Sequence, residues 1–252
     1  MIKEKKCLII IQARSNSNRF PKKVLSNIEG KPMLWHVINR IKQINCCDVI
    51  VATTTRKTDK RIVDIARESG VKYYKGKKDD VLDRFFKAAV KFKADIIIRI
   101  TADCPLIDPK ESYKVLRKFL RGNYDYVSNG NETYPDGLDT ECFSFKSLKQ
   151  AWKNAKLKSE REHVTPYIWK NKKILKIGSV KNNGKNMALY RWSIDYKDDL
   201  TFIRKVYAKL YKKKRIFLMN DVLNLLRKEP QLMQINSHHI RNEGYAISLQ
   251  ND

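Results

Sequence analysis

Short apolar runs alternate with amphipathic segments along the first half of the chain, and this alternation restricts the fold more than any other feature. Apolar runs of strand length stand at residues 7–12, 48–53, 71–74, 95–100 and 122–127. Segments with helical apolar spacing lie between them, at residues 32–44, 58–69, 79–92 and 108–120. Strands that alternate with helices are typical of an α/β fold with a mostly parallel central sheet. The isoleucine-rich run 95–100 is expected to be a central strand.

The pattern changes after residue 128. A loop rich in Gly, Asn and Pro spans 129–137, and strands are expected at 138–145, 174–180 and 188–194. The Ser159-x-x-Glu162 spacing predicts a capping box that opens a helix over 159–169. Two further helices are expected at 200–211 and 220–227. Because no repeat or linker interrupts the chain, we predict one domain over 1–252, with about 129–190 as an inserted subregion on the acceptor side of a pocket.

Composition places limits on the class of protein. Apolar residues make up 42% of the chain, enough for a sizeable core. No apolar run approaches the ~20 residues that cross a bilayer, so no membrane insertion is expected. The five cysteines include no CxxC pair, and their odd number fits no closed disulfide framework. We therefore expect a reducing cytoplasm, with Cys7, Cys104 and Cys142 as free thiols that act as small apolar residues.

The chain is strongly basic, with 53 Lys and Arg against 27 Asp and Glu and a net charge of +26. Such a charge raises the question of a nucleic-acid partner or an anionic surface. The lysines are dispersed, however, and no aromatic-interleaved RNA-binding pattern accompanies them. The composition therefore favours solvated lysine-rich faces over nucleic-acid binding.

A polar loop at 13–23 follows the first expected strand, and ligands of open α/β sheets lie outside the carboxyl ends of the strands. Arg14, Arg19 and Lys23 stand in this loop. Backbone N–H groups of such a loop can face phosphates, arginine adds a bidentate fork and lysine a point charge. The loop is thus a candidate triphosphate site, with an ordinary exposed basic loop as the alternative. The absence of GxGxxG and GxxxxGK[ST] argues against dinucleotide-binding and P-loop enzymes.

Two aspartates follow expected strands. Asp103 stands just past the run 95–100, and Asp195 just past 188–194. Mg²⁺ binds phosphates through one or two protein carboxylates while keeping several waters. We predict that both aspartates bind one Mg²⁺ ion; the structural alternatives are a turn before Pro105 and a helix N-cap.

Further polar side chains offer hydrogen-bond donors and acceptors that suit a polyhydroxylated substrate. His163, which follows two acids, is a candidate base, although a lone histidine near a helix start is more often structural. The candidate acceptor-side residues are Tyr134, Asp136, Glu141, Arg161, His163 and Arg191.

An ordered series of segments resembles a known family. The series is IQAR through PxKVL at 11–25, GKPM at 30–33, VATT at 51–54, DDVLDR at 79–84, RITADCPLI at 99–107, YPDGLD at 134–139, SEREHVTPY at 159–167 and RNEGY at 241–245. It resembles the cytidylyltransferases, which include enzymes that activate 3-deoxy-manno-octulosonate and acylneuraminates, and most of all their SpsF-like spore-coat polysaccharide branch. The resemblance spans nearly the whole chain.

The resemblance implies a nucleotide-diphospho-sugar-transferase fold, Rossmann-like and three-layered, with CTP as donor, Mg²⁺ as cofactor and a homodimer. Matched residue by residue, it places Ala13, Arg14 and Lys23 in the CTP loop and Asp103 and Asp195 at the metal. Arg14, Lys23 and Asp103 are the expected catalytic residues. The same motifs supply the remaining expected nucleotide contacts, which are Gln12, Arg19, Thr53, Thr101 and Ala102. The family usually has glycines near Asn16 and at Lys22, so the loop's exact geometry is open.

The expected reaction is transfer of CMP from CTP to a sugar acid or related sugar, with release of pyrophosphate, for surface polysaccharide or glycan synthesis. One alternative keeps the same nucleotide site and uses a phosphate or phosphonate acceptor. The other is a non-catalytic relative that binds a nucleotide or nucleic acid. The joint presence of Arg14, Lys23, Asp103 and Asp195 argues against this last class.

Overall fold

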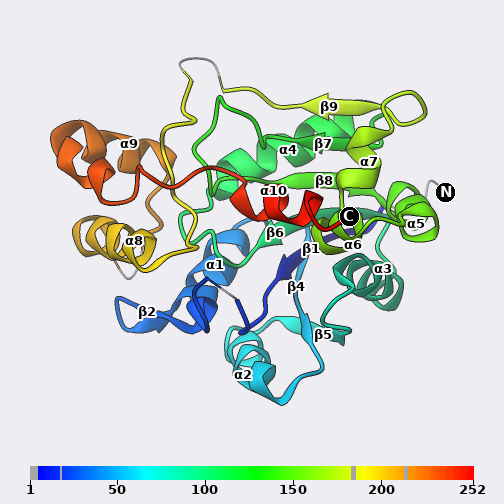
Figure 1. Ribbon diagram of the computed structural model, residues 1–252, viewed down its shortest axis with the longest axis horizontal. Helices are drawn as coiled ribbons and strands as arrows, with labels where there is room; N and C mark the ends of the chain where they lie inside the picture. The colour runs from blue at the N-terminus through cyan, green and yellow to red at the C-terminus, as the bar shows by residue number, and fades with distance from the viewer. Residues whose placement is uncertain (1–4, 18, 183–185, 213–214) are drawn as a thin grey trace.

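The computed structural model describes the chain except for residues 1–4, 18, 183–185 and 213–214. A seven-stranded sheet with the order β5-β4-β1-β6-β8-β7-β9 forms its centre (Figure 1). Neighbours among β5, β4, β1 and β6 pair in parallel, β8 runs antiparallel to β6 and β7, and β9 is parallel to β7. The strands are β1 (Cys7–Gln12), β4 (Asp48–Thr54), β5 (Lys72–Gly76), β6 (Ile96–Thr101), β7 (Tyr126–Ser128), β8 (Glu141–Ser144) and β9 (Ile177–Ser179).

Helices cover both faces of the sheet and give three layers (Figure 1). One face carries α1 (Met33–Ile41), α2 (Lys60–Glu68), α4 (Pro109–Arg121), α8 (Lys197–Leu210) and α9 (Met219–Lys228). The other face carries α3 (Val81–Phe92), α5 (Phe145–Asn154), α6 (Lys158–His163) and α7 (Pro166–Lys170). The predicted α/β class with a mostly parallel sheet is therefore confirmed.

The two apolar cores follow from the alternation of side chains along buried strands. In β1, Ile9 and Ile11 pack into one core, and Leu8 and Ile10 into the other. Successive strand side chains point to opposite faces, so a strand covered on both sides reads as a continuous apolar run. None of the described helices is long and apolar enough to cross a membrane.

Several elements were not expected from the sequence. A small hairpin pairs β2 (Asn27–Ile28) with β3 (Lys31–Pro32), and short 3₁₀ turns occur at η1 (Lys23–Leu25), η2 (Lys57–Asp59) and η3 (Pro230–Ile235). Helix α5 follows β8 without a break, and α10 (Glu243–Leu249) closes the chain. Figure 1 shows α10 in front of β6 and β8.

Two expected elements in the second half are wrong. Residues 188–194 form no strand, because they share only one bridge, between Asp136 and Arg191, with the 134–139 loop. The expected helix 159–169 is split into α6 and α7 at Val164, whose φ of 73° interrupts helical geometry. Ser159 does not cap α6, since its hydroxyl donates to Asp252. Residues 183–185 of the expected insertion lie outside the described residues.

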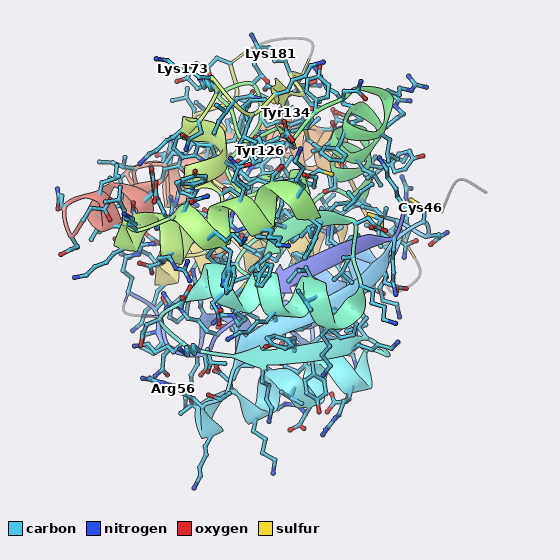
Figure 2. The ribbon with its side chains drawn as sticks, turned by 90° about the vertical axis from the view of Figure 1, so that its right-hand side faces the viewer. Cys46, Arg56, Tyr126, Tyr134, Lys173 and Lys181 are labelled. Carbon is cyan, nitrogen blue, oxygen red and sulfur yellow. A yellow bond between two sulfur atoms is a disulfide. The ribbon has the colours of Figure 1, made fainter. Side chains whose placement is uncertain are left out.

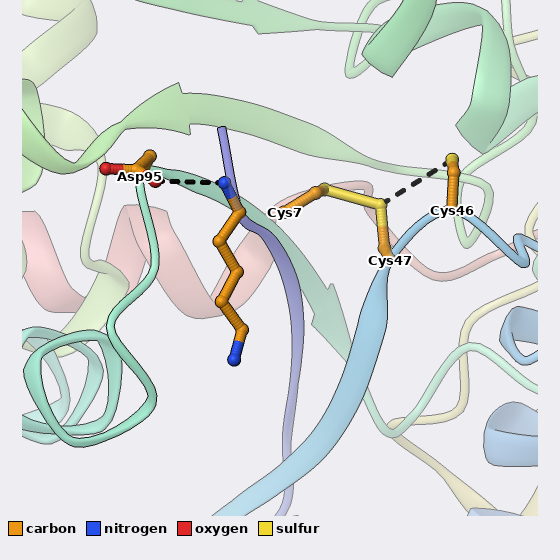
Figure 3. The surroundings of a disulfide bond; sticks show 5 residues. Cys7, Cys46, Cys47 and Asp95 are labelled. Carbon is orange, nitrogen blue, oxygen red and sulfur yellow. Dashed lines mark hydrogen bonds between the residues drawn. A yellow bond between two sulfur atoms is a disulfide. The ribbon is translucent and has the colours of Figure 1, made fainter. Parts of the chain in front are cut away.

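The expectation that Cys7 is a free thiol is also wrong. Cys7 begins β1 and Cys47 precedes β4, and the pair forms a disulfide with a Cα–Cα distance of 4.8 Å (Figure 3). Because β1 and β4 are paired neighbours, the fold brings together two residues that are 40 positions apart. The Sγ of the exposed Cys46 lies 3.9 Å from that of Cys47. Cys104 and Cys142 are buried free thiols, as expected.

Exposed cations are spread over the molecule. Figure 2 shows Lys173 and Lys181 at one outer edge and Arg56 near the opposite one, whereas Tyr126 and Tyr134 lie inside. This arrangement agrees with the dispersed lysines of the sequence.

Candidate active site

A cavity of about 340 Å³ lies at the carboxyl ends of β1 and β6. The last residues of these strands, Gln12 and Thr101, pair in register, so the loops that follow begin side by side. This is the edge at which open α/β sheets bind ligands. The described residues that line it are Gln12, Arg14, Ser17, Arg19, Lys23, Val24, Arg99, Thr101, Ala102, Asp103, Cys104, Asp136, Asp139, Glu162, His163, Arg191, Ser193, Asp195, Asn242, Glu243, Gly244 and Tyr245.

Lys23 is the centre of the site. Its ammonium lies 2.8 Å from Oδ2 of Asp103 and 2.8 Å from Oδ1 of Asp195. A third hydrogen bond of 2.6 Å goes to the carbonyl of Ile194, and Lys23 is only 7% exposed. All three donor positions of the ammonium are therefore used, and the two carboxylates converge on one point.

Burial and ion pairing act in opposite directions on these groups. Burial would lower the pKa of Lys23, but Asp103 and Asp195 raise it above its usual value. Burial would raise the pKa of Asp103, but the ammonium of Lys23 holds it below the usual range. The pKa of Asp195 is lowered in the same way by Lys23 and then Arg19. The three groups are therefore charged at neutral pH.

Arg19 joins the basic loop to two acidic groups from distant parts of the chain. Its guanidinium lies 2.7 Å from Asp195 and 2.8 Å from Oε2 of Glu243, which also accepts a hydrogen bond from Tyr196. The charge of Asp195 is thus shared between Lys23 and Arg19.

Arg191 is held behind Asp195 by three carboxylates. It lies 2.9 Å from Asp199, 3.2 Å from Asp195 and 3.4 Å from Asp136. Burial and the negative charge of Asp139 raise the pKa of Asp136 to about 6, although Ser193 donates a hydrogen bond to it. Because Arg191 is committed to this network, it positions Asp195 at the cavity wall.

The loop after β1 is held by local contacts. The backbone N–H of Ser15 donates to Asp59 at 2.8 Å, and the N–H of Lys22 donates to the carbonyl of Ser15 at 2.7 Å. Lys22 adopts the left-handed conformation with φ 60°, which glycine adopts without a Cβ penalty. At this position, where the resemblance led us to expect glycine, the backbone therefore adopts a conformation that suits glycine. Asn16 is not among the residues with positive φ.

The other expected nucleotide residues separate into two groups. Gln12, Thr101 and Ala102 line the cavity, and so does Arg14, which pairs with Glu162 at 3.3 Å. Ala13 and Thr53 are buried beside β1 and do not line it. Gln12 has a buried side-chain oxygen without a hydrogen-bond partner among the described residues.

The structure brings only half of the expected acceptor-side residues to the cavity. Asp136, His163 and Arg191 line it, and Tyr134, Glu141 and Arg161 do not. Tyr134 is buried and donates to Glu111, and Glu141 accepts from Tyr126 and Thr165 and pairs with Arg99. Arg161 pairs with Asp80 and also donates to the carbonyl of Trp152.

One glycine allows the acceptor-side loop to approach the segment that carries Arg191. A Cβ at Gly137, whose φ is 98°, would lie 2.6 Å from the backbone carbon of Trp192. Glycine is therefore required for Asp136 and Arg191 to meet.

Several cavity residues were not selected from the sequence, among them the polar side chains of Arg99, Glu162, Glu243 and Tyr245. Each stands inside a motif of the series, so the signal was present, but only the fold shows that the last two reach β1 and β6. His163 is half-buried, and this burial, followed by the charge of Arg99, lowers its pKa to about 4. It is therefore neutral at pH 7.

A larger cavity, of about 1070 Å³, lies against α1, α4 and α8. It contains none of the residues at the strand ends, so it is separate from the site above. Among the described residues, Asp198, His238 and His239 form one group that could hold a metal ion, although the sequence showed no metal spacing of histidines. That group does not line the cavity at β1 and β6.

Fold and site together define a nucleotidyltransferase: an α/β sheet carries a basic loop and two convergent carboxylates at its carboxyl edge. A sequence model of the cytidylyltransferase family matches residues 8–231, and the chain belongs to that family. It is 38% identical over 251 residues to the uncharacterized protein MJ1063 of Methanocaldococcus jannaschii, covering 95% of this chain and 98% of that one.

Two further proteins show the same relationship. The spore coat polysaccharide biosynthesis protein SpsF of Bacillus subtilis is 28% identical over 88% of this chain and 95% of its own length. The structure of a cytidylyltransferase from Leptospira borgpetersenii superposes with a TM-score of 0.86 at 30% identity, covering 91% of this chain and 97% of that chain. The predicted family and fold are therefore confirmed.

Proposed function

We propose that this enzyme transfers CMP from CTP to a polyhydroxylated acceptor, a sugar acid or related sugar, with Mg²⁺ as cofactor and with release of pyrophosphate. The observation that carries the proposal is the convergence of Asp103 and Asp195 on the ammonium of Lys23, beside a loop with two further cations. The family name supports the cytidylyl donor, and the SpsF relative supports a role in polysaccharide synthesis.

The donor set suits Mg²⁺. Asp103 and Asp195 each place one carboxylate oxygen 2.8 Å from a single point, and hard oxygen ligands of this kind are those that Mg²⁺ prefers. These two residues would hold the ion, which supplies charge neutralisation at the reacting phosphate when bound. The ammonium of Lys23 occupies that point in this structure. It would have to move aside for the ion and would then lie within reach of the nucleotide phosphates.

The chain's own residues do the rest by position and charge. An acceptor hydroxyl attacks the α-phosphorus in line, the bond to pyrophosphate breaks, and the hydroxyl proton leaves to solvent. Arg14 and Lys23 stabilise the negative charge on the departing pyrophosphate, a contribution that is largest in a site shielded from water. Arg19 adds a third cation at this wall if it exchanges its carboxylate partners for phosphate oxygens.

The remaining expectations are part of the same proposal. We keep one domain over 1–252 with an acceptor-side insertion at about 129–190, a homodimer, and the cytoplasm, where CTP is available. Because Cys7 and Cys47 form a disulfide, the cysteines no longer support a reducing cytoplasm. Leu189 and Ile240, which are 86% and 74% exposed, are apolar side chains that a partner subunit could cover. Light scattering of the purified protein tests the dimer.

The function is tested by pyrophosphate release with Mg²⁺, each of the four NTPs and a panel of acceptors. The panel contains sugar acids, neutral sugars, sugar phosphates and phosphonates. Release with CTP and a sugar acid or related sugar supports the proposal. Release only with a phosphate or phosphonate would support the nucleotide site but show that the acceptor belongs to a different class. The proposal would be refuted if no combination of nucleotide and acceptor released pyrophosphate and CTP did not change the melting temperature.

A further inference from the structure

The C-terminal segment forms one wall of the cavity although it lies beyond the residues that the sequence model of the family matches. The match ends at residue 231, whereas Asn242, Glu243, Gly244 and Tyr245 line the cavity. Hydrogen bonds and ion pairs to two other parts of the chain hold this segment in place. Arg241 donates to the carbonyls of Asn131 and Tyr134 and pairs with Asp139, and Glu243 pairs with Arg19. The wall is therefore a built part of the site.

Tyr245 is the exceptional residue of this wall. Its hydroxyl is buried and has no hydrogen-bond partner among the described residues. Other buried tyrosines are satisfied: Tyr134 donates to Glu111 and Tyr207 to the carbonyl of Pro105. A buried hydroxyl without a partner has lost its hydrogen bonds to water and gained none from the protein, so such groups call for an explanation.

The ring of Tyr245 is held in place by aromatic neighbours. His163 meets it edge-on with 5.1 Å between ring centroids, and Trp169 does so at 5.8 Å. His163 is in turn fixed by a contact of 2.9 Å between its Nε2 and the hydroxyl of Ser248, one turn along α10. The orientation of the phenol is thus set by packing, and its hydroxyl is left for a ligand.

The charges of the lining indicate what kind of group this ligand presents. Every cation of the lining is already ion-paired, as Arg14 with Glu162, Arg99 with Glu141 and Arg191 with three aspartates. Arg99 nevertheless keeps a buried Nε without a partner among the described residues. The α6–α10 side therefore offers unpartnered hydrogen-bonding groups at Tyr245 and Arg99, which suit the hydroxyl groups of a sugar.

We propose that α6 and the segment 242–248 form the acceptor subsite, in which the Tyr245 hydroxyl and Arg99 Nε hydrogen-bond to sugar hydroxyl groups. This proposal rests on the proposed function. It adds which part of the cavity binds the acceptor and which groups recognise it. Tyr245 then determines acceptor affinity and leaves CTP binding unchanged.

The test is hydrogen–deuterium exchange of the full chain. One sample contains CTP and Mg²⁺, and another also contains 3-deoxy-manno-octulosonate, N-acetylneuraminate and N-acetylglucosamine at millimolar concentration. We expect CTP to protect the 12–23 loop and the sugars to slow exchange further in 243–249. No effect of the sugars on 243–249 would overturn the subsite. Failure of CTP to protect 12–23 would instead overturn the proposed function, so the two failures are distinguishable.

Tyr245→Phe tests the hydroxyl, with Tyr113→Phe, 45% exposed and outside the cavity, as the matched control. Because the buried hydroxyl makes no bond to the described residues, the variant should be at least as stable as the unmodified protein. Sugar-induced protection of 243–249 should need at least ~10-fold more sugar, with the midpoint of CTP protection unchanged. An unchanged sugar midpoint, a weakened CTP midpoint or a marked loss of stability would each contradict the assignment.

Discussion

The ammonium of Lys23 lies 2.8 Å from a carboxylate oxygen of Asp103, a residue 80 positions further along the chain. The contact follows from topology: β1 and β6 are paired parallel neighbours, so the loops that leave them share one edge of the sheet. Asp195 reaches the same ammonium from a third segment. The two carboxylates thus share a lysine that is itself expected to contact phosphate.

Asp103→Asn should lose at least ~100-fold in turnover while the protein stays folded, because a neutral amide is a poor ligand for the metal and a poor partner for Lys23. Rates of pyrophosphate release and circular dichroism check both parts. Asp79→Asn, whose side chain is 82% exposed, is the control and should keep its activity. Near-normal turnover of the Asp103 variant would contradict the proposal that this residue binds the metal.

Lys23→Met should lower the free energy of unfolding by about 3 kcal/mol, since it leaves Asp103 and Asp195 without their shared cation. If the carboxylates form the metal site, Mg²⁺ should restore part of this loss and stabilise the variant more than the unmodified protein. Urea unfolding with and without Mg²⁺ measures the difference. Equal responses of the two proteins to Mg²⁺ would contradict the two-aspartate assignment.

Lys22→Gly should raise the free energy of unfolding by about 1 kcal/mol, because Lys22 occupies the left-handed region where a Cβ is unfavourable. The contrasting variant is Lys205→Gly on the exposed face of α8, which should lose about 1 kcal/mol. Thermal unfolding of both variants compares the two signs. A loss at both positions would show that the Lys22 side chain has a stabilising contact that outweighs its backbone strain.

His36 should make the protein less stable in acid. It is 2% exposed, and burial lowers its pKa from 6.5 to about 4. Between these values the unfolded chain binds the proton and the folded chain does not, so stability falls as pH drops through this window. The loss from pH 7 to pH 5 amounts to about 2 kcal/mol for this residue.

His36→Asn removes the titration and should flatten the pH dependence of unfolding over that range. Stability curves of the variant and the unmodified protein, measured by urea unfolding at several pH values, provide the comparison. Parallel curves would mean that His36 is not the group responsible. His163 also has a pKa of about 4, so a smaller slope is expected to remain.

The first half of the fold, and the placement of Lys23 and Asp103 at one edge of the sheet, could be predicted because both depend on local patterns. Buried parallel strands read as apolar runs. Asp103 stands just past β6, and Lys23 lies at the end of the loop that follows β1. Residues 188–194 look like a strand in isolation, yet only their contacts with the 134–139 loop decide their structure. Local pattern does not contain such long-range pairings.

The acceptor side was predicted less well for the same reason. Motif letters select polar residues without showing which way they point, so Tyr134, Glu141 and Arg161 were chosen although each is satisfied inside the protein. Tyr245 was passed over because nothing local shows that α10 returns to β6. The pairing of Cys7 with Cys47 likewise depends on the order of β1 and β4 in the sheet.

Calorimetric titration of CTP into the unmodified protein, with and without Mg²⁺, tests the central claim most directly. We predict saturable binding of CTP with Mg²⁺, at least ~10-fold weaker binding without the ion, and a similar loss in Asp103→Asn. ATP, GTP and UTP should bind more weakly than CTP. Absence of CTP binding, or binding that neither Mg²⁺ nor Asp103→Asn alters, would contradict a nucleotide and metal site built on Lys23, Asp103 and Asp195.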